Sequence, residues 1–220
     1  MPDLNFKIGG ARAAARSLTP LLQFDVEVEN RSPTEEIHAV LLQAQIQIQS
    51  PARSYSPREK ERLGELFGPP ERWGQTLRGR LWASPSATIG GFRESAHATL
   101  TVPCTYDLTF ATVKYLYALE NGDVPFLFLF SGTVFYAAPA GRWQVQQIPW
   151  DRECSFRMPV TTWQEMIESH YPRSAWLYLD RNVFDRLYAF KRRHGFSSWD
   201  QTIEHMLAEI EDLGKVDALA

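Results

Sequence analysis

"IHAVLLQAQIQIQS", Ile37 to Ser50, alternates apolar and polar side chains. A period of two is typical of a β-strand with one buried face and one open face. The expected buried set is Leu42, Ala44, Ile46 and Ile48, and the expected open set is Gln43, Gln45, Gln47 and Gln49. Uncharged amides on a strand face can hydrogen-bond a partner without a large desolvation penalty, and they also suit a solvated sheet face.

The preceding stretch, "LLQFDVEVEN" at residues 21–30, has the same period. Phe24, Val26 and Val28 fall on one face and Asp25, Glu27 and Glu29 fall on the other. The polar segment "NRSPTEE" between the two runs indicates a turn. We therefore expect these two strands to pair as an antiparallel hairpin.

A short helix is expected after the second strand. Ser56 followed by Glu59 is a capping-box pattern, and Pro57 suits the first helical position. The helix should cover residues 57–67 and end at Gly68. We expect residues 53–92 to form an insertion between sheet strands, with loop structure and one short strand near 79–82.

The second half changes from strand to helix periods. Helical spacing is expected near residues 108–120, and "VPFLFLFSGTVFYA" at 124–137 is apolar at consecutive positions. That run predicts a strand buried on both faces, with Gly132 marking a bulge. From Trp163 onward the apolar spacing is helical.

These patterns predict an α+β fold, an antiparallel sheet or small sandwich with a helical C-terminal layer. Residues 1–160 should be the mainly antiparallel β domain, with helices near 57–67 and 108–120. Residues 161–214 should form helices packed on it, and residues 215–220 a tail.

Composition limits the possible partners. The 220-residue chain has a formal charge of −3, which argues against a whole-protein footprint on nucleic acid. No apolar run is long enough to span a membrane, and the first residues lack a secretory pattern. Two cysteines, Cys104 and Cys154, suit a reducing compartment, so we expect a cytoplasmic protein.

No motif names a chemistry. The five His residues fall in no metal-ligand pattern, and no nucleotide-binding glycine motif occurs. We therefore expect no metal and no cofactor. An enzyme whose site is assembled from distant residues remains an alternative, with Cys104 and His97 as its candidate groups.

The segment from Ala175 to Glu209 has a strand-like run, a helix, a Gly turn and a second helix. This order resembles a ribbon–helix–helix unit, which implies a DNA-binding dimer whose paired strands lie in the major groove. The strand "AWLYLD" lacks the Arg, Lys, Asn and Gln that read base edges. A packed helical layer is the competing interpretation.

Most of the chain resembles a bacterial family of unknown function, often encoded beside uptake nickel–iron hydrogenase genes. The resemblance rests on "VPFLFLFSGTVFY", "IPWD", "FRMPVTTWQEMIESHYP", "AWLYLDR" and "SSWDQTIEHML". It implies an accessory role near a metalloenzyme, with a protein partner such as a hydrogenase component; a homo-oligomer stays open.

The expected function is thus a non-enzymatic binding or assembly module. Trp, Tyr and Arg often anchor protein interfaces, and the amides of the polar strand face can bond a partner. The candidate contact residues are the four amides and three tryptophans expected to be exposed: Gln43, Gln45, Gln47, Gln49, Trp73, Trp82 and Trp150.

Overall fold

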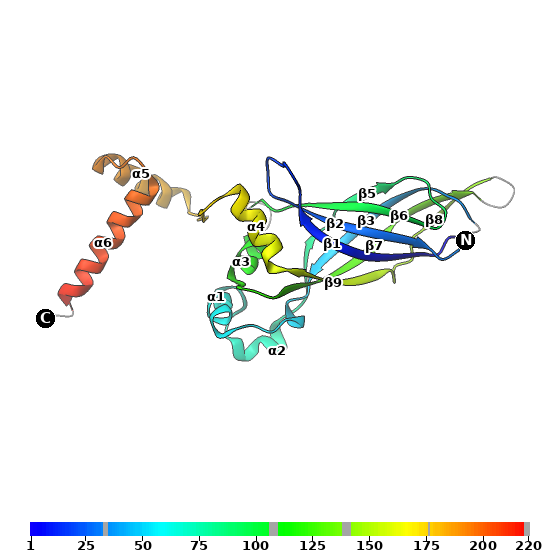
Figure 1. The fold of residues 1–220 in the computed structure, drawn as a ribbon. Coiled ribbons are helices and arrows are strands. Elements are labelled where there is room, and N and C mark those ends of the chain that lie inside the picture. Colours follow the sequence, from blue (N-terminus) through cyan, green and yellow to red (C-terminus); the bar gives the residue numbers. More distant parts are fainter. Residues whose placement is uncertain (33–34, 106–109, 138–141, 176, 218–220) are drawn as a thin grey trace. The chain divides into compact units, whose positions relative to one another are not determined.

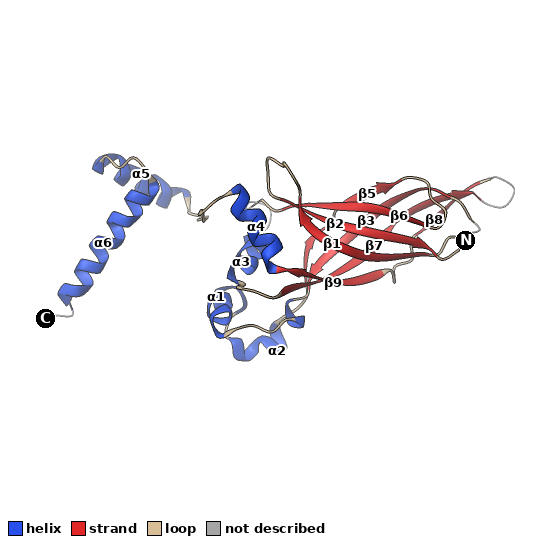
Figure 2. Cartoon of the chain, viewed as in Figure 1, coloured by secondary structure: helices blue, strands red, loops and turns tan. Residues whose placement is uncertain are grey.

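The computed structural model describes residues 1–32, 35–105, 110–137, 142–175 and 177–217. Contacts divide the chain into two compact units, Met1–Ser174 and Ala175–Ala220. Antiparallel sheets and helices occupy the first unit and helices the second, which confirms the predicted α+β class (Figure 2). Each unit is described by itself below.

The strands of the first unit form two sheets (Figure 1). The three-stranded sheet has the order β1-β2-β6, from β1 (Leu4–Ala13), β2 (Leu21–Asn30) and β6 (Ser95–Pro103). In the six-stranded sheet, the central strands β3 and β7 pair with each other, and β4 and β5 pair with β3 while β8 and β9 pair with β7. These strands are β3 (Ile37–Ile48), β4 (Arg80–Ala83), β5 (Ser86–Ile89), β7 (Asp123–Ala137), β8 (Trp143–Gln147) and β9 (Glu153–Pro159).

The predicted hairpin between residues 21–30 and 37–50 is wrong. Strand β2 pairs with β1 and β6, whereas β3 lies in the other sheet. The chain passes from one sheet to the other after β2, and the buried side chain of Asn30 stabilises this passage. Its amide donates to the backbone oxygens of Ser32, Glu35 and Arg93. Alternation shows which face of a strand is buried, but it does not show which strand is its neighbour.

Aromatic rings join the inner faces of the two sheets. The ring centroid of Phe24 on β2 lies 5.8 Å from that of Phe126 and 5.2 Å from that of Phe128, both on β7. Phe6 on β1 stacks on Phe130 with centroids 4.5 Å apart. Offset and edge-to-face ring pairs of this kind add to the free energy gained by burying the rings. The core therefore lies between the sheets.

Four helices of the first unit gather at one end of the strands, the end opposite the N-terminus (Figure 1). They are α1 (Pro57–Phe67), α2 (Trp73–Thr76), α3 (Phe110–Ala118) and α4 (Val160–His170), with short 3-10 turns at Ser50–Ala52 and Pro70–Arg72. The predicted helix at 57–67 is confirmed, and the helix expected near 108–120 is observed as α3; residues 108 and 109 lie outside the described residues. The segment 53–92 is only partly an insertion, because β4 and β5 return to the sheet beside β3.

A buried ion pair fastens α1 to the loop before β7. Arg53 donates to Glu59 through Nη2, at 2.6 Å, and both side chains are almost fully buried. Arg53 also donates to the backbone oxygens of Asn121 and Asp123, each at 2.6 Å. The Glu59 carboxylate completes the predicted capping box with Ser56 and also accepts from the backbone N–H of Glu120. Segments sixty residues apart are thereby linked by charged hydrogen bonds.

The second unit contains α5 (Arg181–His194) and α6 (Trp199–Asp217). Asp180 caps α5 by accepting from the N–H of Asn182, and Gly195 ends the helix in the left-handed conformation. The strand expected at residues 175–180 is wrong, since residues 175 and 177–180 carry no strand and residue 176 is not described. Of the predicted C-terminal helical region, α4 belongs to the first unit, and α5 and α6 form the second.

Candidate binding face

The four glutamines lie on the outer face of the six-stranded sheet. Gln43 and Gln45 are exposed, Gln47 and Gln49 are half-buried, and the alternate residues from Leu42 to Ile48 are buried. The predicted orientation of this strand is therefore confirmed. Gln49 donates to the side-chain oxygen of Gln47 at 3.2 Å. Gln43 and Gln45 make no such bond within the described part of the chain, so their amides remain available to a partner.

Strand register extends this face over the neighbours of β3. Gln43 pairs with Ser86 on β5 and Ser131 on β7, and Gln45 pairs with Leu129. Paired residues point to the same side of a sheet. The outward residues in the middle of β3, β5 and β7 are here called the uncharged face: Leu41, Gln43, Gln45, Gln47, Ser86, Thr88, Leu127, Leu129, Ser131 and Thr133. No side chain of this set carries a charge.

The apolar members of the uncharged face are partly open to solvent. Leu41 is exposed, and Leu127 and Leu129 are half-buried. The expectation that β7 is buried on both faces is therefore wrong: the side chains that face the three-stranded sheet are buried, whereas those on the uncharged face are not covered by a second layer. An apolar run in the sequence indicates that a strand is buried on at least one face. It does not show whether the second face is covered by a helix of the same chain or by another protein.

The outer face of the three-stranded sheet provides an internal contrast. Its outward positions include Lys7 on β1 and Asp25, Glu27 and Glu29 on β2. Lys7 forms an ion pair with Glu27 at 3.4 Å, and Arg12 forms one with Asp25. Such cross-strand charges are what a solvated sheet face usually carries. On the outer face of the six-stranded sheet, exposed charges lie on the edge strand β9, where Glu153 pairs with Leu129 and Arg157 with Pro125. The uncharged face is therefore a patch on the central strands, bordered by these charges.

Two of the three predicted contact tryptophans are core residues. Trp73 packs against Tyr55 and Phe67 and donates through Nε1 to the backbone oxygen of Gly68 at 2.9 Å. Trp82 stacks on Phe126 of the core. Both are 7% exposed, so the expectation that they are exposed is wrong. For a tryptophan near glycine and proline, the neighbouring residues in the sequence do not show whether its side chain is buried or exposed.

The third tryptophan, Trp150, is 92% exposed. Sequence reasoning missed another one, Trp143, which is 69% exposed on β8 and stacks on His38 with ring centroids 4.2 Å apart. Val145, two residues along, is also exposed. Trp143 pairs with Ala137 and Val145 with Phe135, at the β8 end of the uncharged face. The alternation of Trp143 and Val145 was the available signal, but it did not show which side was open.

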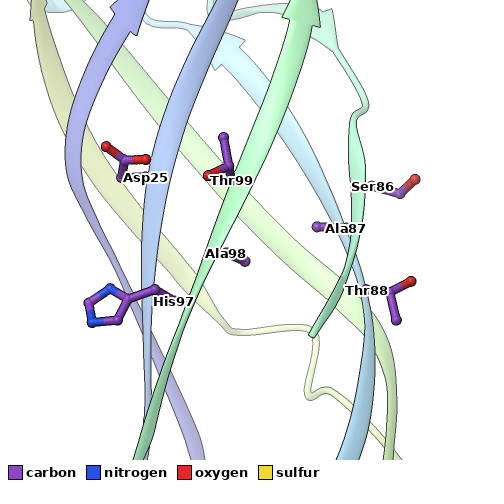
Figure 3. Close-up of a pocket in the computed structure, with 7 residues that line it drawn as sticks. All are labelled: Asp25, Ser86, Ala87, Thr88, His97, Ala98 and Thr99. Atoms are coloured by element: carbon purple, nitrogen blue, oxygen red, sulfur yellow. The ribbon is translucent and has the colours of Figure 1, made fainter. Parts of the chain in front are cut away.

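An open hollow of about 490 Å³ lies between β5 and β6. Figure 3 shows that only Ala87 and Ala98 face the gap between these strands. The side chains of Asp25 and His97 extend outward on one side, and those of Ser86 and Thr88 extend on the other (Figure 3). Reactive groups therefore do not converge in this hollow, as an active site would require.

The two groups of the enzyme alternative do not meet. His97 is exposed in the middle of β6, whereas Cys104 follows the end of that strand and is 3% exposed. Seven residues of extended chain separate them by about 23 Å. Burial raises the pKa of the Cys104 thiol to about 12, against a weaker opposing effect of a hydrogen bond from the backbone of Leu22. A thiol with this pKa is a poor nucleophile at neutral pH.

Among the described residues, no three His, Cys, Asp or Glu side chains are grouped as metal ligands require. Within the same residues, no helix combines the length and apolar character that crossing a bilayer demands. The basic end of α5 has a local structural role, since Lys191 donates to the backbone oxygens of Phe196 and Ser197 beyond the helix end. Cations at this end also complement the helix dipole.

Comparison with known proteins places the chain in a family without assigning an activity. The sequence matches no curated protein. Among solved structures, the chain is similar to the crystal structure of the "Putative ApaA Protein from Bordetella pertussis", at 12% identity and a TM-score of 0.26, over 71% of this chain and 94% of that one. The family DUF6084, described as a family of unknown function, matches residues 1–214. The chain therefore belongs to the DUF6084 family.

Proposed function

We propose that this protein is a non-enzymatic binding or assembly module of the cytoplasm, and that the uncharged face binds a protein partner. The observation that carries this proposal is the absence of charge across the ten residues of the uncharged face on β3, β5 and β7. The centres of protein interfaces are depleted of Lys, Glu and Asp relative to the remaining surface. The outer face of the other sheet follows the usual solvated pattern, so the difference is local to one face.

The residues of the uncharged face suit a flat protein surface. Leu41, Leu127 and Leu129 offer apolar area, and the free amides of Gln43 and Gln45 can each donate and accept hydrogen bonds. With strands about 4.8 Å apart and residues about 3.3 Å apart, three strands over eight residues give about 400 Å². Patches of this size on a folded protein are often functional. The partner surface should be uncharged and should present apolar groups together with backbone or amide hydrogen-bond groups.

Partner identity is the finer part of the proposal. The family resemblance carried by "VPFLFLFSGTVFY" and the C-terminal segments favours a component of a nickel–iron hydrogenase system. A direct metal-handling role has less support, because the described residues lack a His and Cys cluster of the kind that nickel or iron would need. Contact between proteins is the mode of action that the surface supports.

The test compares two variants of the full chain. Gln43→Glu with Gln45→Glu places two carboxylates on the uncharged face, and Gln23→Glu places one on the charged sheet by the same kind of substitution. Tagged chains are used to capture proteins from native cells, and any captured partner is then purified and titrated against each variant. Unpaired charges buried in an interface cost several kcal/mol, so the double variant should bind at least about 100-fold more weakly.

The control variant should bind as the wild type does. A purified partner whose affinity is unchanged by the double variant would contradict the proposal, as would the absence of any partner that binds the purified wild-type chain. Hydrogenase subunits in the captured material would support the finer identification only if their binding depends on the uncharged face.

A further inference from the structure

Helices α5 and α6 leave most of their apolar side chains in solvent. The exposed residues on α5 are Val183, Phe184 and Tyr188, and those on α6 are Ile203, Leu207 and Ile210. Leu207 is 53% exposed and Ile210 is 63% exposed. In the described part of the second unit, Thr202 alone is classed as buried. A unit of this size has too little interior to sustain itself by its own core.

Ring contacts join the start of α6 to α5 along most of the length of α5, from Phe184 in its first turn to Phe190. Trp199 contacts Phe184 and Tyr188, with ring centroids 5.5 and 6.2 Å apart, and His205 lies 6.3 Å from Phe190. These contacts reach only the first two turns of α6. The next apolar positions, Leu207 and Ile210, therefore remain uncovered.

The exposed residues form one stripe on each helix, although Trp199 covers part of Phe184 and of Tyr188. At about 100° per residue, Ile203, Leu207 and Ile210 fall within about 60° of one another around α6. Val183, Phe184 and Tyr188 fall within about 140° around α5. Amphipathic stripes of this kind normally pack against another helix. These six residues of α5 and α6 are together called the exposed stripe.

The charges that border the two stripes are opposite in sign. Arg181 and Arg192 lie within about 40° of Tyr188 on α5, and Asp200 and Glu211 lie within about 40° of Leu207 on α6. Helix α5 carries five Lys and Arg residues against a single carboxylate. Helix α6 up to Glu211 carries four carboxylates and no Lys or Arg. The basic border of the α5 stripe is therefore complementary in charge to the acidic border of the α6 stripe.

We propose that the exposed stripe is covered by the same stripe of a second copy of this chain. A two-fold axis would place α5 of each copy on α6 of the other, because every contact in such an interface occurs twice. This arrangement pairs basic borders with acidic ones, whereas packing like helices together would place equal charges opposite each other. The two helices then complete a four-helix bundle whose apolar stripes meet in the centre.

The available area is sufficient for a specific dimer. Helices of 14 and 19 residues have a combined length of about 50 Å, so contact along their whole length over a width of about 10 Å would bury about 500 Å² per copy, with the exposed stripe at the centre. The total of about 1,000 Å² meets the lower limit for specific interfaces. The dimer should therefore be reversible and dependent on concentration.

Sedimentation of the full chain from about 1 to about 100 µM tests the proposal, and wild type should reach twice its monomer mass of 25.2 kDa. Leu207→Glu should weaken self-association at least about 100-fold, because each dimer would bury two additional carboxylates. Leu18→Glu makes the same change at a fully exposed position in the first unit and should have no effect. Tyr188→Glu tests α5 independently, and circular dichroism measures whether each variant keeps its helices.

The other outcomes are equally definite. A wild-type chain that stays monomeric at about 100 µM would overturn the proposal. The stripe would then bind a different partner or remain exposed to solvent. A dimer that survives both Leu207→Glu and Tyr188→Glu in folded chains would also overturn it. Raising the salt concentration from about 0.05 to about 0.5 M should weaken the dimer severalfold, and no change would contradict the charge pairing. The Gln43→Glu and Gln45→Glu variant should remain dimeric, which separates this proposal from that of the uncharged face.

Discussion

Glu59→Gln is expected to be one of the most destabilising isosteric changes in the first unit. The Glu59 carboxylate accepts from Arg53 at 2.6 Å and from the backbone N–H groups of Ser56 and Glu120, each at 2.9 Å. An amide of the same shape has one oxygen and one NH₂ group. Three donors face this side chain, so the NH₂ group would meet at least one of them without an acceptor. The substitution also leaves the buried Arg53 without its counter-charge.

The magnitude follows from the burial of both partners. Removing one member of a buried ion pair costs about 3–5 kcal/mol, because the remaining charge is left desolvated and uncompensated. The backbone oxygens of Asn121 and Asp123 still accept from Arg53, which favours the lower half of that range. With a urea dependence of about 2 kcal/mol per molar, the unfolding midpoint should fall by about 1.5–2 M.

Urea unfolding followed by near-ultraviolet circular dichroism measures this change, since Trp73 and Trp82 are packed in the first unit. Glu61→Gln is the matched control on the exposed side of α1 and should stay within about 0.5 kcal/mol of wild type. Arg53→Met combined with Glu59→Gln should cost less than the sum of the single changes, because the two side chains act as a pair. A loss below about 1 kcal/mol for Glu59→Gln would show that the buried pair does not stabilise the first unit as described.

Three further expectations concern the same unit. Burial raises the pKa of the Glu59 carboxyl, but hydrogen bonds from the backbone of Glu120 and Ser56 and from Arg53, together with the Arg53 charge, bring that pKa below its ordinary value. The ionised carboxylate therefore stabilises the fold fully above the ordinary Glu pKa of about 4.3, and this stabilisation is lost as the pH falls through the lower pKa of the folded state. Wild type should therefore lose more free energy of unfolding than Glu59→Gln between pH 5 and pH 2. Cys104, whose pKa is raised to about 12, should resist a thiol reagent at pH 8 until urea unfolds the chain. Rapid labelling at Cys104 itself in the folded protein, as distinct from the half-buried Cys154, would contradict its burial. Gly132→Ala should cost at least about 2 kcal/mol in urea unfolding, because φ is +141° and the new Cβ would lie 2.0 Å from the Leu41 oxygen; Gly64→Ala, with no atom within 4 Å, should cost nothing.

Local patterns predicted the local structure of the chain well. The capping residues of α1, the alternation of β3 and the glycine end of α5 depend on neighbours in sequence, so single residues were sufficient to predict them. The pairing of β2 with β6 rather than β3 depends on contacts over seventy residues, and alternation carries no information about such contacts. The strand β5 was missed because Ser86, Ala87 and Thr88 lack the apolar period that a buried strand shows.

The candidate binding face could be predicted in part for the same reason. The outward direction of Gln43 and Gln45 follows from the period of one strand. The wider uncharged face required the register that places Ser131 and Leu129 beside them, and no sequence pattern supplies that register. The burial of Trp82 depends on Phe24 and Phe126, which reach it from two other strands. Side chains whose environment comes from distant segments are those that sequence reasoning misplaced.

We expect the uncharged face, and not the charged face of the other sheet, to contact the protein partner. Carbene footprinting of the purified complex, read out by mass spectrometry, measures this directly by comparing labelling of each strand in the free and bound chain. Binding should protect the outward side chains of β3 and β7, including Gln45 and Leu129, while Lys7 and Glu27 are labelled as in the free chain. Protection of Lys7 and Glu27 with unchanged labelling of Gln45 and Leu129 would contradict this expectation.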